Sequence, residues 1–221
     1  MQRFATIEGW VFDLDNTLYP ASQNLFAQID KRMTAFIGEA LAVERDKAYR
    51  LQKQFLGEYG TTLAGLMNKH GLPPGPFLDF VHDIDVSPLT PDPKLSNALA
   101  NLPGKKYIFT NGTQKHAERV SDRLGVLHHF DDIFDIVSAD FIPKPSLETY
   151  KKIIEKYKIE PQYSIFIEDI ARNLKPAHEL GMKTVWIIND EPWAAEFSNS
   201  NFINYRTDKL SKFLKEINES K

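Results

Sequence analysis

The chain has 221 residues, enough to bury a hydrophobic core without disulfides or a structural metal and too few for a long array of modules. Hydrophobic residues make up 42% and charged residues 26%, which excludes collagen-like, low-complexity and wholly disordered proteins. The 27 basic and 30 acidic residues leave a net charge of −3, so the chain lacks the positive field that attracts nucleic acid polymers or anionic membranes. With no cysteine, disulfide frameworks, cysteine-ligated zinc, iron–sulfur clusters and thiol nucleophiles are excluded as well.

The sequence shows neither a targeting nor a membrane-spanning segment. Residues 1–8 lack the apolar region of a secretory signal. The most hydrophobic stretch, residues 185–188, is far shorter than the ~18 residues that a membrane-spanning helix needs. We therefore expect a cytoplasmic protein with neither a membrane nor a nucleic acid polymer as partner.

The first predicted element is a strand at residues 9–12, where Gly-Trp-Val-Phe forms a short apolar run. Its apolar character is continuous rather than alternating. This is expected for a strand of a parallel sheet with helices covering both faces.

A long helical region follows this strand. Residues 22–84 show only helical periodicity, for example at Leu25, Ile29 and Met33. The prolines at 72–76 predict a turn between helices, and those at 86–93 predict a linker. We therefore expect a helical cap domain at 20–90, inserted into a core domain formed by 1–19 and 91–221.

Beyond the linker, apolar runs alternate with segments of helical period. Strands are predicted at 106–109, 134–137, 163–167 and 184–188, and helices at 113–124, 146–157, 171–180 and 207–221. This alternation predicts an α/β fold built on a Rossmann-like, doubly wound parallel sheet.

Two carboxylates follow the first predicted strand directly. Asp13 and Asp15 can point the same way, because successive side chains of an extended chain alternate in direction. In open α/β sheets, ligands bind at the carboxyl ends of the strands. A pair of aspartates that only caps a turn is the structural alternative.

Three later elements carry polar groups to the same edge. Thr110, Asn111 and Gly112 follow the strand at 106–109, next to a helix start that can bind an anion. Lys144 lies between two prolines, which restrict the backbone around it. The strand at 163–167 ends in Glu168 and Asp169. Oxygen donors without cysteine indicate a hard cation, Mg²⁺ rather than zinc.

Taken together and in this order, the four elements resemble the haloacid dehalogenase-like hydrolases, a family of mostly Mg²⁺-dependent phosphatases. The resemblance covers nearly the whole chain and implies that family's core with an inserted cap. The string Asp-Leu-Asp-Asn-Thr-Leu-Tyr-Pro at 13–20, with Thr110-Asn111-Gly112 and the pair Asp169 and Asn173, is similar to the pyrimidine 5′-nucleotidase branch. Members of that branch hydrolyse UMP- and CMP-type monophosphates.

The resemblance implies catalytic roles for four residues. Asp13 would attack phosphorus and form an aspartyl-phosphate, and Asp15 would act first as general acid and then as general base. Thr110 and Lys144 would bind the transferring phosphoryl group. Mg²⁺ would be bound by the Asp13 carboxylate, the Asp15 backbone carbonyl and Asp169.

The resemblance also implies residues that bind the substrate or support the metal ligands. The substrate-binding set is Leu14, Asn16, Thr110, Asn111, Gly112 and Lys144. The residues expected to support the metal ligands without binding the metal are Thr17, Glu168 and Asn173. Many relatives have two aspartates where this chain has Glu168 and Asp169, so we assign Asp169 as the ligand.

The function expected from these residues is Mg²⁺-dependent hydrolysis of a small phosphate monoester, a pyrimidine nucleoside 5′-monophosphate. One alternative is a phosphatase or phosphomutase for another small sugar phosphate, such as a phosphoglycolate-like compound. A 2-haloacid dehalogenase and a non-catalytic binding module are also possible functions for such a chain. The sequence does not indicate the oligomeric state.

Overall fold

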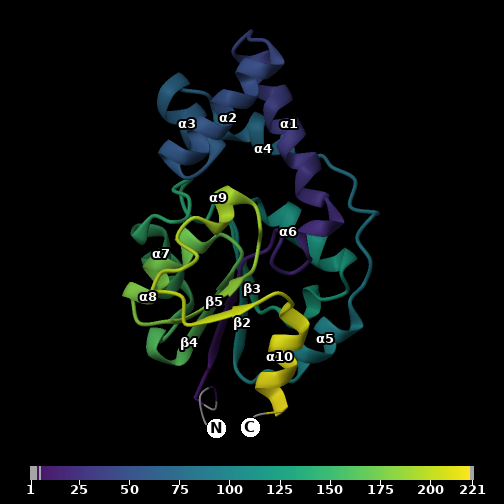
Figure 1. Ribbon diagram of the computed structural model, residues 1–221, viewed down its shortest axis with the longest axis vertical. Coiled ribbons are helices and arrows are strands. Elements are labelled where there is room, and N and C mark those ends of the chain that lie inside the picture. Colours follow the sequence, from purple (N-terminus) through teal and green to yellow (C-terminus); the bar gives the residue numbers. More distant parts are fainter. Residues whose placement is uncertain (1–3, 5, 220–221) are drawn as a thin grey trace.

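In the computed structural model, which describes residue 4 and residues 6–219, one parallel sheet forms the centre of the molecule (Figure 1). The strand order is β3-β2-β1-β4-β5-β6. The chain adds β2 and β3 on one side of β1, then crosses over and adds β4, β5 and β6 on the other side. Its strands are β1 (Gly9–Phe12), β2 (Lys105–Phe109), β3 (Asp132–Phe134), β4 (Ser164–Glu168), β5 (Lys183–Ile187) and β6 (Tyr205–Thr207). This is the doubly wound α/β fold that the alternation of strands and helices predicts.

Both faces of the sheet are buried, which explains the continuous apolar runs of its strands. Trp10 and Phe12 of β1 belong to a core cluster shared with α5, α6 and α10. Val11 belongs to a second cluster shared with α7 and α8. Figure 1 shows α7 and α8 to one side of the sheet and α5 and α10 to the other. These helices are α5 (Pro93–Ala100), α6 (Gln114–Arg123), α7 (Leu147–Tyr157), α8 (Leu174–Glu179) and α10 (Leu210–Glu219).

The chain between β1 and α5 forms a group of helices that lies beyond one end of the sheet, at the top of Figure 1. These helices are α1 (Leu25–Ala40), α2 (Arg45–Tyr59), α3 (Thr62–His70) and α4 (Pro74–His82). Leu25 and Ile29 of α1 belong to the same hydrophobic cluster as Trp10 of the sheet. The helical region is therefore present, while its division from the core at residues 20 and 90 stays a prediction.

Two proline-containing segments differ from expectation. Helix α4 begins at Pro74, inside the predicted turn, because proline at the first helical position loses no hydrogen bond there. The predicted linker ends in the start of α5, a helix the periodicity did not predict. Asp92 caps this helix by accepting hydrogen bonds from the backbone N–H groups of Lys94 and Leu95.

Two strands also differ. The strand predicted at 134–137 lies at Asp132–Phe134, because Asp135 leaves the strand and accepts hydrogen bonds from the backbone N–H groups of Gln114 and Ser138. Strand β6 was not predicted, since its Tyr-Arg-Thr sequence is only half-buried at the edge of the sheet.

The remaining predicted helices are present with shifted ends. A short 3₁₀ turn at Ala171–Asn173 precedes α8, where one helix was predicted over 171–180. The terminal helix predicted at 207–221 is α10, and residues 220–221 lie outside the described residues. In the described part of the chain, no helix combines the length and the apolar character needed to cross a membrane.

Candidate active site

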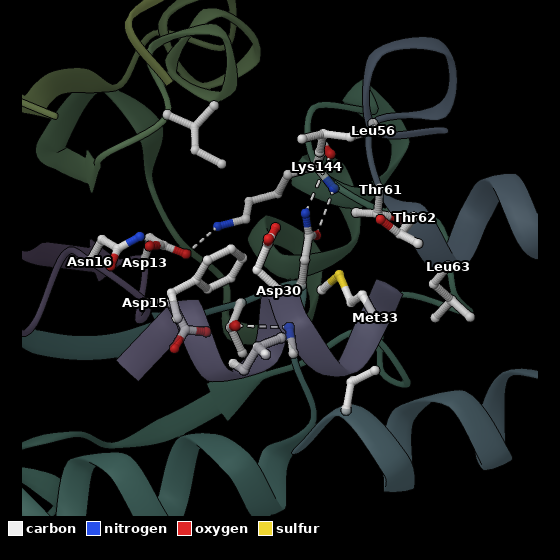
Figure 2. A pocket seen from close by; sticks show the side chains of 18 of the residues that line it. Asp13, Asp15, Asn16, Asp30, Met33, Leu56, Thr61, Thr62, Leu63 and Lys144 are labelled. Atoms are coloured by element: carbon white, nitrogen blue, oxygen red, sulfur yellow. Dashed lines mark hydrogen bonds and ion pairs between the residues drawn. The ribbon is translucent and has the colours of Figure 1, made fainter. Parts of the chain in front are cut away.

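A cavity lies between the carboxyl edge of the sheet and helices α1 to α4, and Figure 2 shows part of its lining. All four polar elements of the sequence reach this cavity, although together they span residues 13–169 of the chain. The lining residues that follow the strands or come from the loops of the core are Asp13, Asp15, Asn16, Thr110, Asn111, Gly112, Lys144, Glu168, Asp169 and Asn173. The structure thus brings the predicted site residues together, with the exceptions of Leu14 and Thr17.

Asp13 follows β1 directly, and both of its carboxylate oxygens accept hydrogen bonds. Its Oδ1 accepts a hydrogen bond from Lys144 Nζ at 2.7 Å, and its Oδ2 accepts one from Thr17 Oγ1 at 2.9 Å. The Asp13 backbone N–H donates to Ile167 of β4 at 2.9 Å, so the strand pairing continues to this residue. Thr17 itself does not line the cavity, and its supporting role stays a prediction.

Lys144 is buried and donates from Nζ to three acceptors. Besides Asp13, these are Glu168 Oε2 at 2.7 Å and the Phe109 carbonyl at 2.9 Å. Burial alone would lower the pKa of Lys144, but the two carboxylates outweigh this effect and raise it, so the side chain stays a cation. Asn111 Oδ1 accepts a hydrogen bond from the Lys144 backbone N–H at 2.9 Å and holds this loop in place.

Three buried acidic side chains gather beside Lys144. Among the described residues, oxygen atoms of Asp13, Glu168 and Asp169 lie within 4.8 Å of one another, close enough to bind one metal ion. Burial, and next the charge of Glu168, raise the pKa of Asp13 to about 7 and that of Asp169 well above its usual range. Adjacent buried carboxylates with an excess of negative charge fit a hard divalent cation.

Within this cluster, Glu168 and Asp169 have different partners. Glu168 binds Lys144 through Oε2 and the backbone N–H of Ile170 through Oε1, at 3.1 Å. Asp169 Oδ2 accepts from Asn189 Nδ2 at 2.7 Å, and its carbonyl accepts from Trp186 Nε1 at 2.7 Å. Both Glu168 oxygens are therefore engaged by the protein, and the supporting role of this residue stays a prediction.

The Asp15 side chain points away from Asp13 and Lys144, as Figure 2 shows, and it is not part of the acidic cluster. Its carboxylate accepts hydrogen bonds from His116 Nε2 at 2.9 and 3.2 Å and from the Tyr19 hydroxyl at 2.6 Å. Burial would raise the pKa of Asp15, but His116 and then Tyr19 outweigh it and lower the pKa below its usual value. The side chain of Asp15 is thus separate from the cluster, and its backbone carbonyl stays the predicted metal ligand.

Sequence reasoning missed His116 and Tyr19. The sequence offers only weak signals for these two contacts: Tyr19 follows Asp15 by four residues, and His116 lies in the first turn of the helix after Thr110. A four-residue spacing in a loop does not fix where the Tyr19 hydroxyl points, and His116 is 101 residues away from Asp15.

The remaining predicted residues differ in how they reach the cavity. Leu14 is fully buried in the core and does not line the cavity, so only its backbone is left for the predicted substrate contact. Asn16 adopts a left-handed conformation with φ of 61° and lines the cavity. Thr110 Oγ1 accepts a hydrogen bond from the Gly112 N–H at 2.9 Å, which shapes the loop after β2. Asn173 lines the cavity, and its carbonyl accepts a hydrogen bond from the Tyr150 hydroxyl.

The helices α1 to α4 and the turn between α2 and α3 give the opposite wall a mostly apolar lining that also holds Thr61, Thr62, His82 and a polar group around Asp30. Asp30 Oδ1 accepts hydrogen bonds from Lys53 Nζ at 2.6 Å and Gln52 Nε2 at 2.8 Å. The apolar side chains on this wall are Phe26, Ile29, Met33, Leu56, Leu63, Phe77, Leu78 and Val81. A substrate in this cavity therefore meets acidic and basic groups on one side and apolar surface on the other.

The fold and the polar groups at its carboxyl edge are those of a Rossmann-like hydrolase. A family model described as haloacid dehalogenase-like hydrolase matches residues 7–181. The chain belongs to the haloacid dehalogenase-like hydrolases and is an enzyme of this hydrolase family.

Individual relatives agree with this assignment. "Phosphate metabolism protein 8" of Saccharomyces cerevisiae is 30% identical to this chain, and the match covers 84% of the chain. The match covers 63% of the yeast protein, so this chain spans less than two thirds of that protein's length. The "Glyceraldehyde 3-phosphate phosphatase" of Methanocaldococcus jannaschii is 26% identical, and the match covers 94% of this chain and 96% of the archaeal protein. Among solved structures, a haloacid dehalogenase-like hydrolase, SP0104 from Streptococcus pneumoniae, has the same fold, with a TM-score of 0.64 at 16% identity over 96% of this chain and 99% of its own.

Proposed function

We propose that the chain is a Mg²⁺-dependent phosphomonoester hydrolase that acts through a phosphorylated Asp13. The observation that carries this proposal is the contrast between two neighbouring carboxylates. Asp13 lies in a buried acidic cluster beside Lys144, whereas Asp15 is bound by His116 and Tyr19. A cation held by the acidic cluster would keep Asp13 ionised as the nucleophile, while Asp15, outside the cluster, is left for acid–base work. The phosphatase names of several relatives support the same conclusion.

In the first half of the proposed reaction, an Asp13 oxygen bonds to phosphorus while the bond from phosphorus to the leaving oxygen breaks. Asp15 gives its proton to that leaving oxygen, which departs as an alcohol. The negative charge of a bound phosphate raises the pKa of a nearby carboxyl group, which favours the protonated form of Asp15 at this stage. Thr110 binds an oxygen of the transferring group, and the Lys144 cation, whose three N–H groups are donated to Asp13, Glu168 and the Phe109 carbonyl, offsets its charge.

In the second half, water attacks the phosphorus of the aspartyl-phosphate and Asp15 accepts the proton of that water. The bond between phosphorus and Asp13 breaks, inorganic phosphate leaves, and the free carboxylate is restored. The lowered pKa of Asp15 keeps it ionised and ready to act as this base.

The acidic cluster supports a metal in this site. The residues that would hold Mg²⁺ are Asp13 and Asp169 through their carboxylates and Asp15 through its carbonyl, with Glu168 bound to Lys144 beside them. When bound, the ion would supply positive charge that offsets the repulsion between the Asp13 carboxylate and a phosphate dianion.

The proposal is tested by phosphate release from 4-nitrophenyl phosphate. We expect the purified chain to hydrolyse this ester, EDTA to abolish the activity, and Mg²⁺ to restore it. Asp13→Asn removes the nucleophilic oxygen at constant size, so turnover should fall by at least about 10³-fold while the circular dichroism spectrum is unchanged. Normal turnover by this variant would refute the mechanism.

For the substrate, we propose a pyrimidine nucleoside 5′-monophosphate. The apolar wall of the cavity and its Asp30–Lys53–Gln52 group suit a leaving group with flat apolar faces and hydrogen-bonding edges. A small sugar phosphate is the second candidate, favoured by the relatives named glyceraldehyde 3-phosphate phosphatase. Comparison of kcat/KM for UMP, CMP, phosphoglycolate and glyceraldehyde 3-phosphate decides between them.

Simple observations distinguish a phosphatase from a dehalogenase, a phosphomutase and a non-catalytic module. A dehalogenase needs no metal, so EDTA-insensitive release of halide would favour it over the phosphatase that the acidic cluster supports. A phosphomutase would transfer the phosphoryl group to a second sugar phosphate, which product analysis detects. A non-catalytic module would release no phosphate from any ester.

A further inference from the structure

The carboxylate of Asp15 is held by two donors that come from different parts of the chain. Tyr19 donates from the loop that follows β1, at 2.6 Å to Oδ1. His116 Nε2 lies 2.9 Å from Oδ1 and 3.2 Å from Oδ2, so it contacts both carboxylate oxygens. These contacts restrict rotation of the carboxylate about both of its side-chain bonds.

His116 is a buried residue with few other partners. It lies in the first turn of α6 and is only 1% exposed. Its Nδ1 has no hydrogen-bond partner within the described residues. An imidazole that contacts a carboxylate through Nε2 and leaves its other nitrogen unsatisfied is hard to explain by stability alone, because an unpaired buried polar atom costs about 1–3 kcal/mol.

A second histidine covers the ring of His116. His82, at the end of α4, stacks on it with ring centroids 4.5 Å apart and an interplanar angle of 17°. Burial, with the neighbouring His116 as the next cause, lowers the pKa of His82 to about 3, so this ring is neutral. His82 Nδ1 also lies 3.3 Å from Thr113 Oγ1, the residue that caps α6.

The end of α4 is fixed to α6 by further contacts. Arg119 of α6 donates from Nη1 to the His82 carbonyl at 3.0 Å and from Nη2 to the Ile84 carbonyl at 2.7 Å. The same helix therefore carries His116 on the face toward Asp15 and Arg119 at the point where the chain leaves α4. A movement of α4 relative to α6 would remove the ring that covers His116.

We propose that His116 is a positioning residue for Asp15, and that His82 holds the His116 ring in place only while α4 is docked on α6. The general acid of the reaction is thereby aimed at the leaving oxygen when the helical region covers the cavity. This inference rests on the proposed phosphatase function, because it assigns a task to Asp15 in that reaction.

The positioning role has a consequence that a structural role does not share. A general acid accelerates departure of a poor leaving group, such as the alkoxide of a nucleoside, far more than departure of 4-nitrophenolate, which leaves without a proton. A misplaced Asp15 should therefore slow phosphoryl transfer from an alkyl ester selectively. Loss of fold or of metal would slow both esters together.

The test compares kcat/KM for UMP and for 4-nitrophenyl phosphate in the full chain with Mg²⁺. His116→Phe keeps a ring against His82 but removes the N–H that contacts Asp15. We expect it to lower kcat/KM for UMP by about 10²-fold and that for 4-nitrophenyl phosphate by less than about tenfold. His116→Gln can donate from a similar position, so its kcat/KM for UMP should be at least about tenfold higher than that of His116→Phe. His82→Ala should show the same selectivity with a smaller loss.

Two further variants calibrate the result. Asp15→Asn should show the same selectivity as His116→Phe, with a larger loss. His128→Phe alters a histidine outside the cavity and should leave both values within about twofold of wild type, as expected for a residue remote from the reacting groups.

The outcomes separate this inference from the proposed function. Equal losses on both esters, no loss, or no rescue by His116→Gln in an active enzyme would overturn the role of His116 alone. Wild-type protein that hydrolyses neither ester would overturn the proposed function, and the inference with it.

Discussion

At the residue scale, Asp13 and Lys144 form the centre of a buried charge network. The Lys144 ammonium contacts Asp13 and Glu168 at 2.7 Å each, and its side chain is 2% exposed. A buried cation contributes to stability mainly by neutralising the carboxylates buried with it. Removing one partner leaves the others buried with uncompensated charge.

Lys144→Met keeps most of the side-chain volume and removes this cation. We expect the free energy of unfolding to fall by about 3–5 kcal/mol at neutral pH without metal, as measured by urea denaturation. Phosphate release should fall by about 10²–10³-fold, because the cation that offsets the charge of the transferring phosphoryl group is lost.

The matched control is Lys152→Met. Lys152 pairs with the exposed side chains of Asp140 and Glu148, so its removal should leave the midpoint of urea denaturation close to that of the wild type. Equal effects of the two substitutions would contradict the importance assigned to burial of Lys144.

At the scale of elements, helices α2 and α3 pack closely at one point. A Cβ atom on Gly65 of α3 would lie 2.3 Å from the Cβ and Cγ atoms of Phe55 in α2. Gly57 is also helical, in α2, but a Cβ there would meet nothing within 4 Å. The two glycines therefore differ in packing and not in helical environment.

Gly65→Ala should destabilise the protein by about 1–3 kcal/mol, since the overlap with Phe55 outweighs the gain in helix propensity. Gly57→Ala should instead stabilise it by up to about 1 kcal/mol, because only the gain in helix propensity applies there. Thermal unfolding of both variants measures the difference, and stabilisation by both would show that α2 and α3 pack less closely than described.

At the scale of the whole molecule, the strands and the loops after them form one buried acidic site, and the helical region lines the cavity opposite it. Burial and Glu168 raise the pKa of Asp13 from 3.8 to about 7. Between these two values the folded protein holds a proton that the unfolded chain has lost. The stability of the metal-free protein therefore falls as the pH rises through this window.

Mg²⁺ should reverse this effect, because it binds the ionised carboxylates. We expect the rise in Tm on adding Mg²⁺ to be larger at about pH 8 than at about pH 5.5, where a proton must first leave. Differential scanning fluorimetry measures this, with Asp169→Asn as the variant that should lose most of the shift. A shift of the same size at both pH values would be evidence against metal binding by this cluster.

Local sequence patterns predict much of the molecule. The apolar run at 9–12 predicted β1, and the positions of Asp13, Thr110 and Asp169 directly after predicted strands indicated that these three residues lie close together. These predictions succeed because strand exits in a parallel sheet share one edge. Strand β6 and helix α5 escaped prediction because their short, polar or proline-containing sequences carry weak periodicity.

Residue periodicity and the order of the motifs were enough to predict the α/β architecture, the helical region between the first two strands, and the set of polar residues at the sheet edge. Which of these residues contact one another became visible in the folded chain. In the folded chain, Glu168 accepts a hydrogen bond from Lys144, the Asp15 carboxylate accepts one from His116, and the His82 ring stacks on His116. The physical reason is that periodicity and turn chemistry act over a few residues, whereas contacts between side chains a hundred residues apart depend on how whole helices pack.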